Sequence, residues 1–390
     1  PLPKETTVPR HHQRTAAGPR GWAAALLIPV LLGAGCSAPQ AEPAEPVGEA
    51  AAAQEAPPAP TPVADTGDIV DLPVVFTVRN QNRTDVPCEP DGKEYRVRGH
   101  LTAPASVLEE DDPSVTLYLH GIATGEWYWR LDLPGYHYTR QMAGLGHASV
   151  TVDRLGYESS DKPEGLRSCI GAQADIAGQI VDQLRTGEYE LEGEKPVEFD
   201  RVTLAGHSNG GQIAQIAAYT FPGIDGLMVM SWTDLGLTDQ ALQRFLTAFQ
   251  ECVDGGEPAE EADDPRGYVH YDPTEQEFVT GNFHDAEQEV IEATLPLRNR
   301  HPCGDMASQL AGVVVDRAQV AEIDIPVLLL YGADDARVQG QAEHEEWFSG
   351  SPDTELVVIP SSGHFVGLER RASEVTDSVS AWLERQEGQG

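Results

Sequence analysis

The sequence predicts an α/β protein built around an open, doubly wound and mostly parallel sheet. Short apolar runs that end in turn residues recur along the chain, and helical stretches separate them. A run that is apolar throughout is typical of a strand covered by helices on both faces, because a strand with one solvated face alternates instead. The chain has 390 residues, of which 40% are hydrophobic, so it can form a large core.

The expected strands fall into two groups. Two early strands are expected at residues 74–78 and 95–101, and the second alternates with a period of two. Six buried parallel strands are expected at residues 115–119, 148–152, 201–205, 224–230, 327–331 and 356–359. Helices are expected at residues 172–184, 211–220 and 374–383. This alternation implies right-handed crossover connections between neighbouring strands.

One long interval interrupts the alternation. Between residues 231 and 323 we recognise no buried strand, while helical stretches occur at 239–250 and 286–294. The interval also contains an acidic tract, residues 257–264. We therefore expect a helical cap inserted into a core formed by residues 69–230 and 324–390. Such a cap would lie over the carboxyl ends of the strands, where α/β sheets bind ligands.

The N-terminal region has the pattern of an export signal. Residues 1–35 contain four basic residues and one acidic residue, followed by an apolar run at 22–32 that is short for a membrane span. The sequence LGAGC, residues 32–36, resembles a bacterial lipoprotein box, which implies cleavage before Cys36 and its lipidation. That family usually has leucine where Gly33 stands here. The alternative is an ordinary secreted protein in which Cys36 is incidental.

Residues 36–68 are expected to form an extended tether after the lipidated cysteine. After Cys36 the segment consists almost only of Ala, Pro, Glu, Gln and Val, without an aromatic or a basic residue. Such a composition cannot bury enough apolar surface to offset the entropy of the chain. We expect the tether to hold the folded body away from a membrane, so that the N-terminal lipid is the membrane contact.

The charge balance excludes some partners. The chain contains 26 Lys plus Arg against 63 Asp plus Glu, a formal net charge of −37. A nucleic-acid partner would need clustered cations, so we expect none. Anionic substrates should be repelled as well. The sequence gives no signal for the oligomeric state.

Four cysteines remain after Cys36. An even number in an exported chain suggests two disulfides. We favour Cys252 with Cys303, because both lie in the expected insertion, and Cys88 with Cys169 by elimination. Four reduced thiols are the alternative.

A candidate nucleophile lies in GHSNG, residues 206–210, which fits the pattern G-x-S-x-G. The motif alone is weak, but it directly follows an expected strand and opens an expected helix, as a nucleophile elbow requires. Gly206 and Gly210 would allow a tight turn that presents Ser208 at the helix N-terminus, where the dipole favours negative charge. An ordinary glycine-rich turn is the alternative.

A serine needs a base to act as a nucleophile. His364 follows the last expected strand and would lie at the carboxyl edge of the sheet, so we predict it as the base. His344 lies in the charged stretch AEHEEW, and we expect it to be a solvated surface residue.

The histidine in turn needs a carboxylate that fixes its tautomer. Asp335 follows the expected strand at 327–331 and is the preferred acid. Its neighbour Asp334 is an alternative, with a turn or helix cap as its structural role. Asp234, after the strand at 224–230, is a second alternative.

The oxyanion of acyl transfer needs donors aimed at it in advance. We expect the backbone N–H of Asn209, directly after the nucleophile, and that of Ile122 in the loop HGIATG, residues 120–125. A plain β-turn is the alternative reading of this loop. Four aromatic residues could shape the nearby pocket or simply pack in the core: Trp127, Tyr128, Trp129 and Trp232.

Together these motifs resemble the α/β-hydrolase superfamily, from about residue 115 to the C-terminus. The segments that carry the resemblance are residues 120–121, 153–160 (DRLGYESS), 206–210, 332–335 (GADD) and 363–364. The resemblance implies an eight-stranded sheet, a triad of Ser208, Asp335 and His364, and no metal or organic cofactor. In that pattern the acid is the third residue after the glycine, which favours Asp335. The family's dehalogenases and most of its epoxide hydrolases use an aspartate nucleophile, so Ser208 argues against both.

The sequence thus predicts an exported, lipid-anchored serine hydrolase that cleaves a neutral or apolar carboxylic ester through an acyl-enzyme. A small-molecule ester is the expected partner. Lactone opening, peptide-bond cleavage and perhydrolysis by the same triad are alternatives. A surface binding module that keeps the fold without catalysis is a further one.

Overall fold

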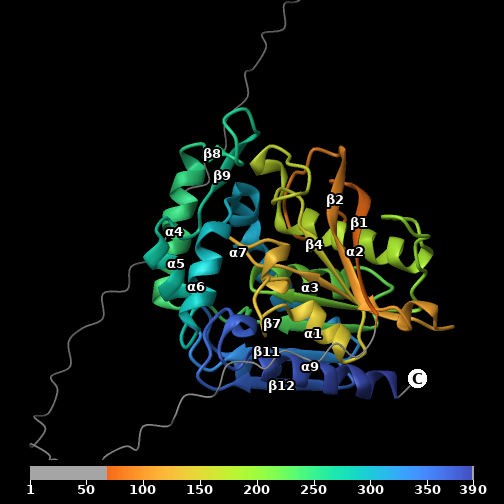
Figure 1. Cartoon of the computed structure of the whole chain (residues 1–390). Coiled ribbons are helices and arrows are strands. Elements are labelled where there is room, and N and C mark those ends of the chain that lie inside the picture. Colours follow the sequence, from red (N-terminus) through yellow and green to blue (C-terminus); the bar gives the residue numbers. More distant parts are fainter. Residues whose placement is uncertain (1–67, 389–390) are drawn as a thin grey trace, which may run out of the picture. The chain divides into compact units, whose positions relative to one another are not determined.

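The computed structural model describes residues 68–388 (Figure 1). The expected signal segment, Cys36 and the tether up to residue 67 lie outside the described residues. Within residues 68–388, no helix combines the length and the apolar character needed to cross a bilayer.

In this described part of the chain the main sheet has nine strands, in the order β12-β11-β7-β6-β3-β4-β2-β1-β5. Their bounds are β1 (Ile69–Arg79), β2 (Glu94–Pro104), β3 (Ser114–Leu119), β4 (Ser149–Asp153), β5 (Glu190–Leu191), β6 (Arg201–His207), β7 (Gly226–Met230), β11 (Val327–Gly332) and β12 (Thr354–Ile359). Six neighbouring strands pair in parallel: β12, β11, β7, β6, β3 and β4. The remaining pairs, β4 with β2, β2 with β1 and β1 with β5, are antiparallel. The predicted mostly parallel α/β sheet is therefore confirmed. All eight expected strands form, and the two-residue β5 adds a ninth at the edge.

Helices cover both faces of this sheet, which explains the continuous apolar runs. Helices α2 (Ile170–Thr186) and α3 (Asn209–Thr220) pack on one face, while α1 (Tyr138–Gly144) and α9 (Ala372–Glu387) pack on the other. Successive residues of β3 alternate between the two cores: Leu117 belongs to the first and Tyr118 to the second. Every residue of β7 and β11 is buried. The carboxyl ends of these strands form the edge at which the candidate site lies.

Residues 231–323, called the insertion below, separate β7 from β11. They contain α4 (Asp239–Val253), α5 (Glu275–Asn282), α6 (Gln288–Thr294) and α7 (Cys303–Gln319). Figure 1 shows α4, α5 and α6 grouped together, while α7 reaches the core and packs on α2 and α3. The short helix α8 (Gln341–Glu345) follows β11 in the core.

The insertion is not purely helical, so that part of the prediction is wrong. It also contains a small antiparallel sheet of β8 (Glu257–Pro258), β9 (Arg266–Val269) and β10 (His301–Pro302). Residues 267–269 of β9 are buried. The strand escapes detection because it has only four residues and follows an acidic tract, so no period can be read from it.

The two expected disulfides are formed, Cys88 with Cys169 and Cys252 with Cys303. The second joins the C-terminal part of α4 to the first residue of α7. It therefore ties the outer part of the insertion to the helix that packs on the core.

Candidate active site

Ser208 lies in the sharp turn between β6 and α3. Its backbone has φ +54° and ψ −124°, a conformation that non-glycine residues rarely adopt and that often marks functional sites. Its N–H donates to the carbonyl of Met230 at 2.7 Å. A Cβ on Gly206 would lie 2.0 Å from the carbonyl oxygen of Gly210. The turn therefore needs the glycine, and it has the geometry expected of a nucleophile elbow.

His364 and Asp335 complete a hydrogen-bonded chain with Ser208. His364 Nε2 lies 2.9 Å from Ser208 Oγ, and Nδ1 lies 2.9 and 3.1 Å from the two oxygens of Asp335. The Asp335 carboxylate also accepts the backbone N–H groups of Arg337 at 2.7 Å and Val338 at 3.2 Å. Because Asp335 can only accept, the proton of a neutral His364 lies on Nδ1, which leaves Nε2 free to take the serine proton.

The alternative acids lie elsewhere. Asp334 has a side chain that is 45% exposed and lies 3.7 Å from His284. Asp234 is buried and accepts hydrogen bonds from Trp232 Nε1 at 3.0 Å and Gln215 Nε2 at 2.7 Å. Neither is hydrogen-bonded to His364 in this structure.

His344 is buried, so its expected place on the solvated surface is wrong. Its Nε2 lies 3.0 Å from Asp234 Oδ2, and its ring packs against Trp347 and Phe348. The charged stretch around it gives no sign of this, because α8 turns one side toward the core and places the acidic residues outward. Asp234 and His344 are therefore hydrogen-bonded to each other inside the core.

The peptide group that joins Gly121 to Ile122 is held in place by hydrogen bonds to its carbonyl oxygen. The carbonyl oxygen of Gly121 accepts hydrogen bonds from His120 Nδ1 at 2.8 Å, Thr124 Oγ1 at 3.1 Å and Arg154 Nη2 at 3.2 Å. The N–H of Ile122 belongs to the same planar trans peptide, so it points in the opposite direction. Three donors on one side of the peptide thus fix the direction of the N–H on the other. Ile122 lines the pocket beside Ser208, where such a fixed donor can stabilise an oxyanion.

The tautomer of His120 follows from its contacts. Its Nε2 accepts the backbone N–H of Arg154 at 3.0 Å, so Nδ1 carries the proton that it donates to Gly121. Burial lowers the pKa of His120 well below its ordinary value, and the nearby Arg154 charge adds to this. His120 therefore stays neutral and keeps this donor in place.

Arg154 is itself held by Asp305 of α7. Its Nη1 lies 3.2 Å from Asp305 Oδ2, and both side chains are nearly inaccessible to solvent. The Tyr157 hydroxyl accepts from Arg154 Nη2 at 2.8 Å and donates to Asp305 at 2.9 Å. Burial raises the pKa of Asp305, while the charge of Arg154 opposes that change. The peptide between Gly121 and Ile122 is thereby connected to the insertion, a link that no sequence pattern indicates.

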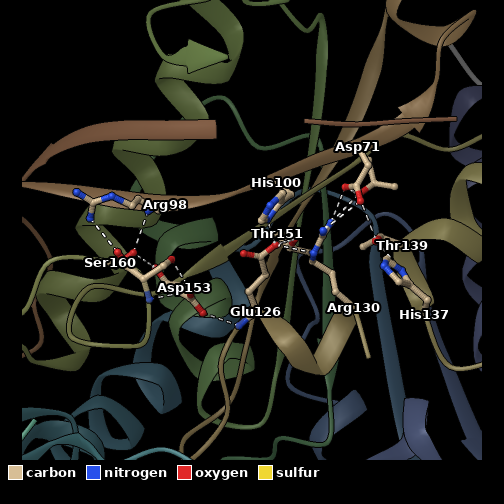
Figure 2. Close-up of polar contacts among 12 residues, drawn as sticks. Asp71, Arg98, His100, Glu126, Arg130, His137, Thr139, Thr151, Asp153 and Ser160 are labelled. Carbon is tan, nitrogen blue, oxygen red and sulfur yellow. Dashed lines mark hydrogen bonds and ion pairs between the residues drawn. The ribbon is translucent and has the colours of Figure 1, made fainter. Parts of the chain in front are cut away.

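A second polar network anchors the end of the same loop (Figure 2). The carboxylate of Asp153 accepts the N–H of Glu126 at 2.7 Å and the hydroxyl of Ser159 at 2.6 Å. Burial raises the pKa of Asp153 to about 6, and the neighbouring charge of Glu126 contributes. Three side chains contact the Glu126 carboxylate in turn: His100, Arg130 and Thr151. The 3₁₀ helix Glu126–Trp129 therefore begins at a fixed position.

Two buried residues position the loop of His364. His207 Nε2 donates to the carbonyl of His364 at 2.8 Å, and its ring stacks on Tyr128 with centroids 4.3 Å apart. Burial lowers the pKa of His207 well below its ordinary value, so this ring stays neutral. Glu369 accepts the N–H of Gly363 at 2.9 Å and two further N–H groups of the insertion. These contacts hold the candidate base from both sides.

A small pocket lies beside Ser208 and is partly open to solvent. Its lining comprises Ile122, Ser208, Asn209, Trp232, Leu237, Tyr271, Asp272, Asn282, Gln309, Arg337, Val338, His364 and Phe365. Of the four aromatic residues considered from the sequence, Trp232 lines the pocket and the other three pack in or against the core. Among residues 68–388, no group of three or more His, Cys, Asp or Glu side chains is arranged to hold a metal ion.

Comparisons with known proteins agree with this architecture. A family model described as "Alpha/beta hydrolase family" matches residues 117–377. A Bacillus subtilis (strain 168) protein assigned as a 2-succinyl-6-hydroxy-2,4-cyclohexadiene-1-carboxylate synthase is 24% identical over 238 residues, which cover 57% of this chain and 76% of that protein.

Two solved structures share the fold at low identity. A thermophilic esterase from Thermogutta terrifontis superposes with a TM-score of 0.55 and 19% identity, covering 80% of this chain and 99% of that one. The enol-lactonase from Burkholderia xenovorans LB400 gives a TM-score of 0.52 and 13% identity, with 74% and 97% covered. At these identities the likeness concerns the fold alone.

Proposed function

Since the chain belongs to the alpha/beta hydrolase family, we propose that it is a serine hydrolase that cleaves a neutral or apolar carboxylic ester through an acyl-enzyme. The observation that carries the proposal is the chain of hydrogen bonds from Ser208 through His364 to Asp335. The net charge of −37 disfavours anionic substrates, which supports an uncharged ester.

In the acylation step, Ser208 Oγ attacks the ester carbonyl carbon while its proton passes to His364 Nε2. Asp335 stabilises the imidazolium through Nδ1–H. The N–H groups of Ile122 and Asn209 donate to the oxyanion. The C–O bond to the alcohol then breaks, and His364 returns the proton to the alcohol oxygen. In deacylation, water gives a proton to His364 Nε2 and attacks the acyl carbon. The bond from that carbon to Ser208 Oγ then breaks, and His364 returns the proton to Oγ, which releases the acid and restores Ser208.

The test compares kcat/KM on p-nitrophenyl butyrate for the wild type and two serine variants. Ser208→Ala should lose at least about a thousandfold, because the nucleophile is gone. Ser362→Ala is the matched control, since Ser362 lies on the loop of His364 and its hydroxyl donates to the Pro360 carbonyl at 3.4 Å. It should keep activity within about threefold.

Two results would overturn the proposal. A higher kcat/KM on an alanine p-nitroanilide than on the ester would identify a peptidase. Failure of the folded wild type to hydrolyse either substrate would favour a binding module without catalysis. Methyl esters, lactones of similar size and peroxide-dependent acyl transfer, assayed in parallel, separate the other reactions of the same triad.

We also propose that the insertion acts as a cap on this site. Six lining residues of the pocket come from it: Trp232, Leu237, Tyr271, Asp272, Asn282 and Gln309. Substitutions among these residues should change substrate preference while a small fluorophosphonate still labels Ser208. Equal losses for all esters would contradict a role in selection.

Export and anchoring through Cys36 are a separate proposal. Two disulfides suit an oxidising compartment. Metabolic labelling with palmitate in a bacterial host should mark the wild type but not Cys36→Ala. Equal labelling of both, or labelling of neither, would contradict lipidation at this cysteine.

A further inference from the structure

The pocket beside Ser208 contains buried polar atoms that no described residue satisfies. From them we infer that the part of the substrate held in this pocket carries an uncharged group that both donates and accepts hydrogen bonds, a hydroxyl or an amide, bound by Arg337 and Asp272. This inference rests on the proposed ester hydrolysis and narrows its substrate class from neutral or apolar to neutral and polar.

Arg337 reaches the pocket from the loop that carries the candidate acid. The residue is 6% exposed, and its Nε donates to Asn282 Oδ1 at 3.0 Å. Its Nη2 donates to Asp272 Oδ2 at 2.6 Å, and its guanidinium lies over the ring of Tyr271. Nη1 makes no hydrogen bond of ordinary length and angle with any residue of the described chain. Nη1 is therefore a buried donor without a partner, on a residue that lines the pocket.

Asp272 offers a matching acceptor. It lines the same pocket and is 3% exposed, and its Oδ1 has no hydrogen-bond partner within residues 68–388. Asp272 and Arg337 therefore provide one unused acceptor and one unused donor from a single ion pair. Both atoms are buried, so leaving them unpaired costs free energy that a substrate group of the right chemistry would recover by hydrogen-bonding to them.

The charges of the pair decide what kind of group fits. The positive charge of Arg337 and the negative charge of Asp272 cancel at 2.6 Å, so the site has no net charge to attract an ion. A carboxylate would face the oxygen of Asp272, and an ammonium would face the guanidinium. A hydroxyl or an amide can accept from Nη1 and donate to Oδ1, so it satisfies both atoms without a charge.

Asn209 adds a second polar position next to the nucleophile. The residue is 1% exposed, and neither Oδ1 nor Nδ2 has a hydrogen-bond partner in the described part of the chain. Its backbone N–H is the proposed oxyanion donor, so the side-chain amide is not needed for that role and stays a buried, unpaired group beside the nucleophile. An alkyl chain in this pocket would leave both Asn209 and the ion pair unsatisfied, which costs binding.

Buried polar sites distinguish strongly between substrates with and without a matching polar group. A pocket built to hydrogen-bond a substrate hydroxyl rejects the analogue without it, because buried donors and acceptors are then left unpaired. Each hydrogen bond that involves a charged group changes kcat/KM by about tenfold to hundredfold. If Arg337 instead only joins the insertion to the loop that carries Asp335, polar and apolar esters should be cleaved with similar kcat/KM.

The experiment compares ester pairs that differ only in the polar group, with acid release followed by titration at constant pH. The alcohol side is tested with 3-hydroxypropyl butyrate against butyl butyrate, and with 2-acetamidoethyl butyrate against 4-methylpentyl butyrate. The acyl side is tested with methyl 6-hydroxyhexanoate against methyl heptanoate. Rates of alkaline hydrolysis correct for intrinsic reactivity. The wild type should prefer the polar member of at least one pair by about tenfold or more in kcat/KM. The hydroxyl and acetamide pairs show which of the two groups the site takes.

The double variant Arg337→Met, Asp272→Leu removes both charges together and so leaves no unpaired buried charge. Its polar-to-apolar ratio should fall to below about threefold. Asp272→Asn keeps the shape and exchanges the acceptor for a donor, so it should lower the ratio even if the double variant fails to fold. The control Arg185→Met, Asp225→Leu removes an ion pair next to the amino end of β7 and should keep the wild-type ratio.

Two results would overturn the inference. One is a wild type that cleaves the apolar member of every pair equally well or better. The other is a polar preference that survives both substitutions of the ion pair. If none of the six esters is hydrolysed, the proposed function is contradicted instead. Titration of Ser208 with a fluorophosphonate counts the reactive enzyme and so distinguishes these outcomes from unfolding.

Discussion

Arg154 joins Asp305 of the insertion to the carbonyl of Gly121, whose peptide carries the proposed oxyanion donor of Ile122. Removing this contact should therefore cause a specific loss of catalysis. In the variant Arg154→Met, Asp305→Leu, the carbonyl of Gly121 loses its charged donor and keeps His120 and Thr124. Both charges are removed together, which avoids the penalty of about 3–5 kcal/mol for leaving one of them buried and unpaired.

The size of the loss can be bounded from these contacts. A hydrogen bond from a charged donor contributes about 1.5–3 kcal/mol, so the Ile122 peptide should hold its direction less firmly by about that much. Complete loss of one oxyanion donor costs about 10²–10³ in kcat. We therefore expect kcat to fall by about tenfold to a few hundredfold. KM should change little, because the donor acts mainly on the charge that develops in the transition state.

Steady-state kinetics on p-nitrophenyl butyrate separate kcat from KM, with active enzyme counted by fluorophosphonate titration. Thr124→Val removes an uncharged donor from the same carbonyl and should cost less, about tenfold at most. A folded double variant whose kcat stays within threefold of the wild type would refute the reasoning. So would a loss that appears only in KM.

Three further outcomes follow from the geometry. Burial raises the pKa of Asp153 from 3.8 to about 6, so the folded state binds the proton more tightly than the unfolded state. The free energy of unfolding of the wild type should therefore fall by up to about 3 kcal/mol as the pH rises from 4 to 7. Urea unfolding of Asp153→Asn should lack most of this pH dependence. Cysteines 252 and 303 are 51 positions apart, so replacing both by serine should lower the free energy of unfolding by about 4 kcal/mol in a chain-entropy estimate, and an unchanged melting temperature would contradict this. Glu369→Gln places an amide next to three N–H donors, one on the His364 loop and two in the insertion, so the loop should be held less firmly. The variant should lower kcat by about tenfold with little change in KM, whereas a loss of stability with unchanged kcat would show a structural role only.

The residues of the candidate site could be found from the sequence because each has a local signal. Ser208 lies between two glycines after an apolar strand, and Asp335 and His364 each follow another such strand. Parallel strands bring their carboxyl ends to one edge of the sheet, so local position predicts spatial proximity. The structure places these three side chains in hydrogen-bond contact.

The residues that support the site could not be found in this way. Asp305 meets Arg154 across 151 positions, and nothing local in the sequence tells it apart from the chain's many other acidic residues. His344 stands among glutamates, and only the packing of α8 shows that it is buried. The unpaired atoms of Arg337 and Asp272 depend on how the insertion packs against the loop that carries Asp335. Such features arise from tertiary packing, which overrides local pattern.

The most direct test of the central claim is to locate the covalent adduct formed with an acylating or phosphonylating agent. The folded wild type is treated with a fluorophosphonate, and the labelled peptide is identified by mass spectrometry over a time course. We predict one adduct, on Ser208, and a labelling rate that falls at least a hundredfold in His364→Ala, because the base no longer accepts the serine proton. An adduct on another residue, or labelling of His364→Ala at the wild-type rate, would contradict the mechanism.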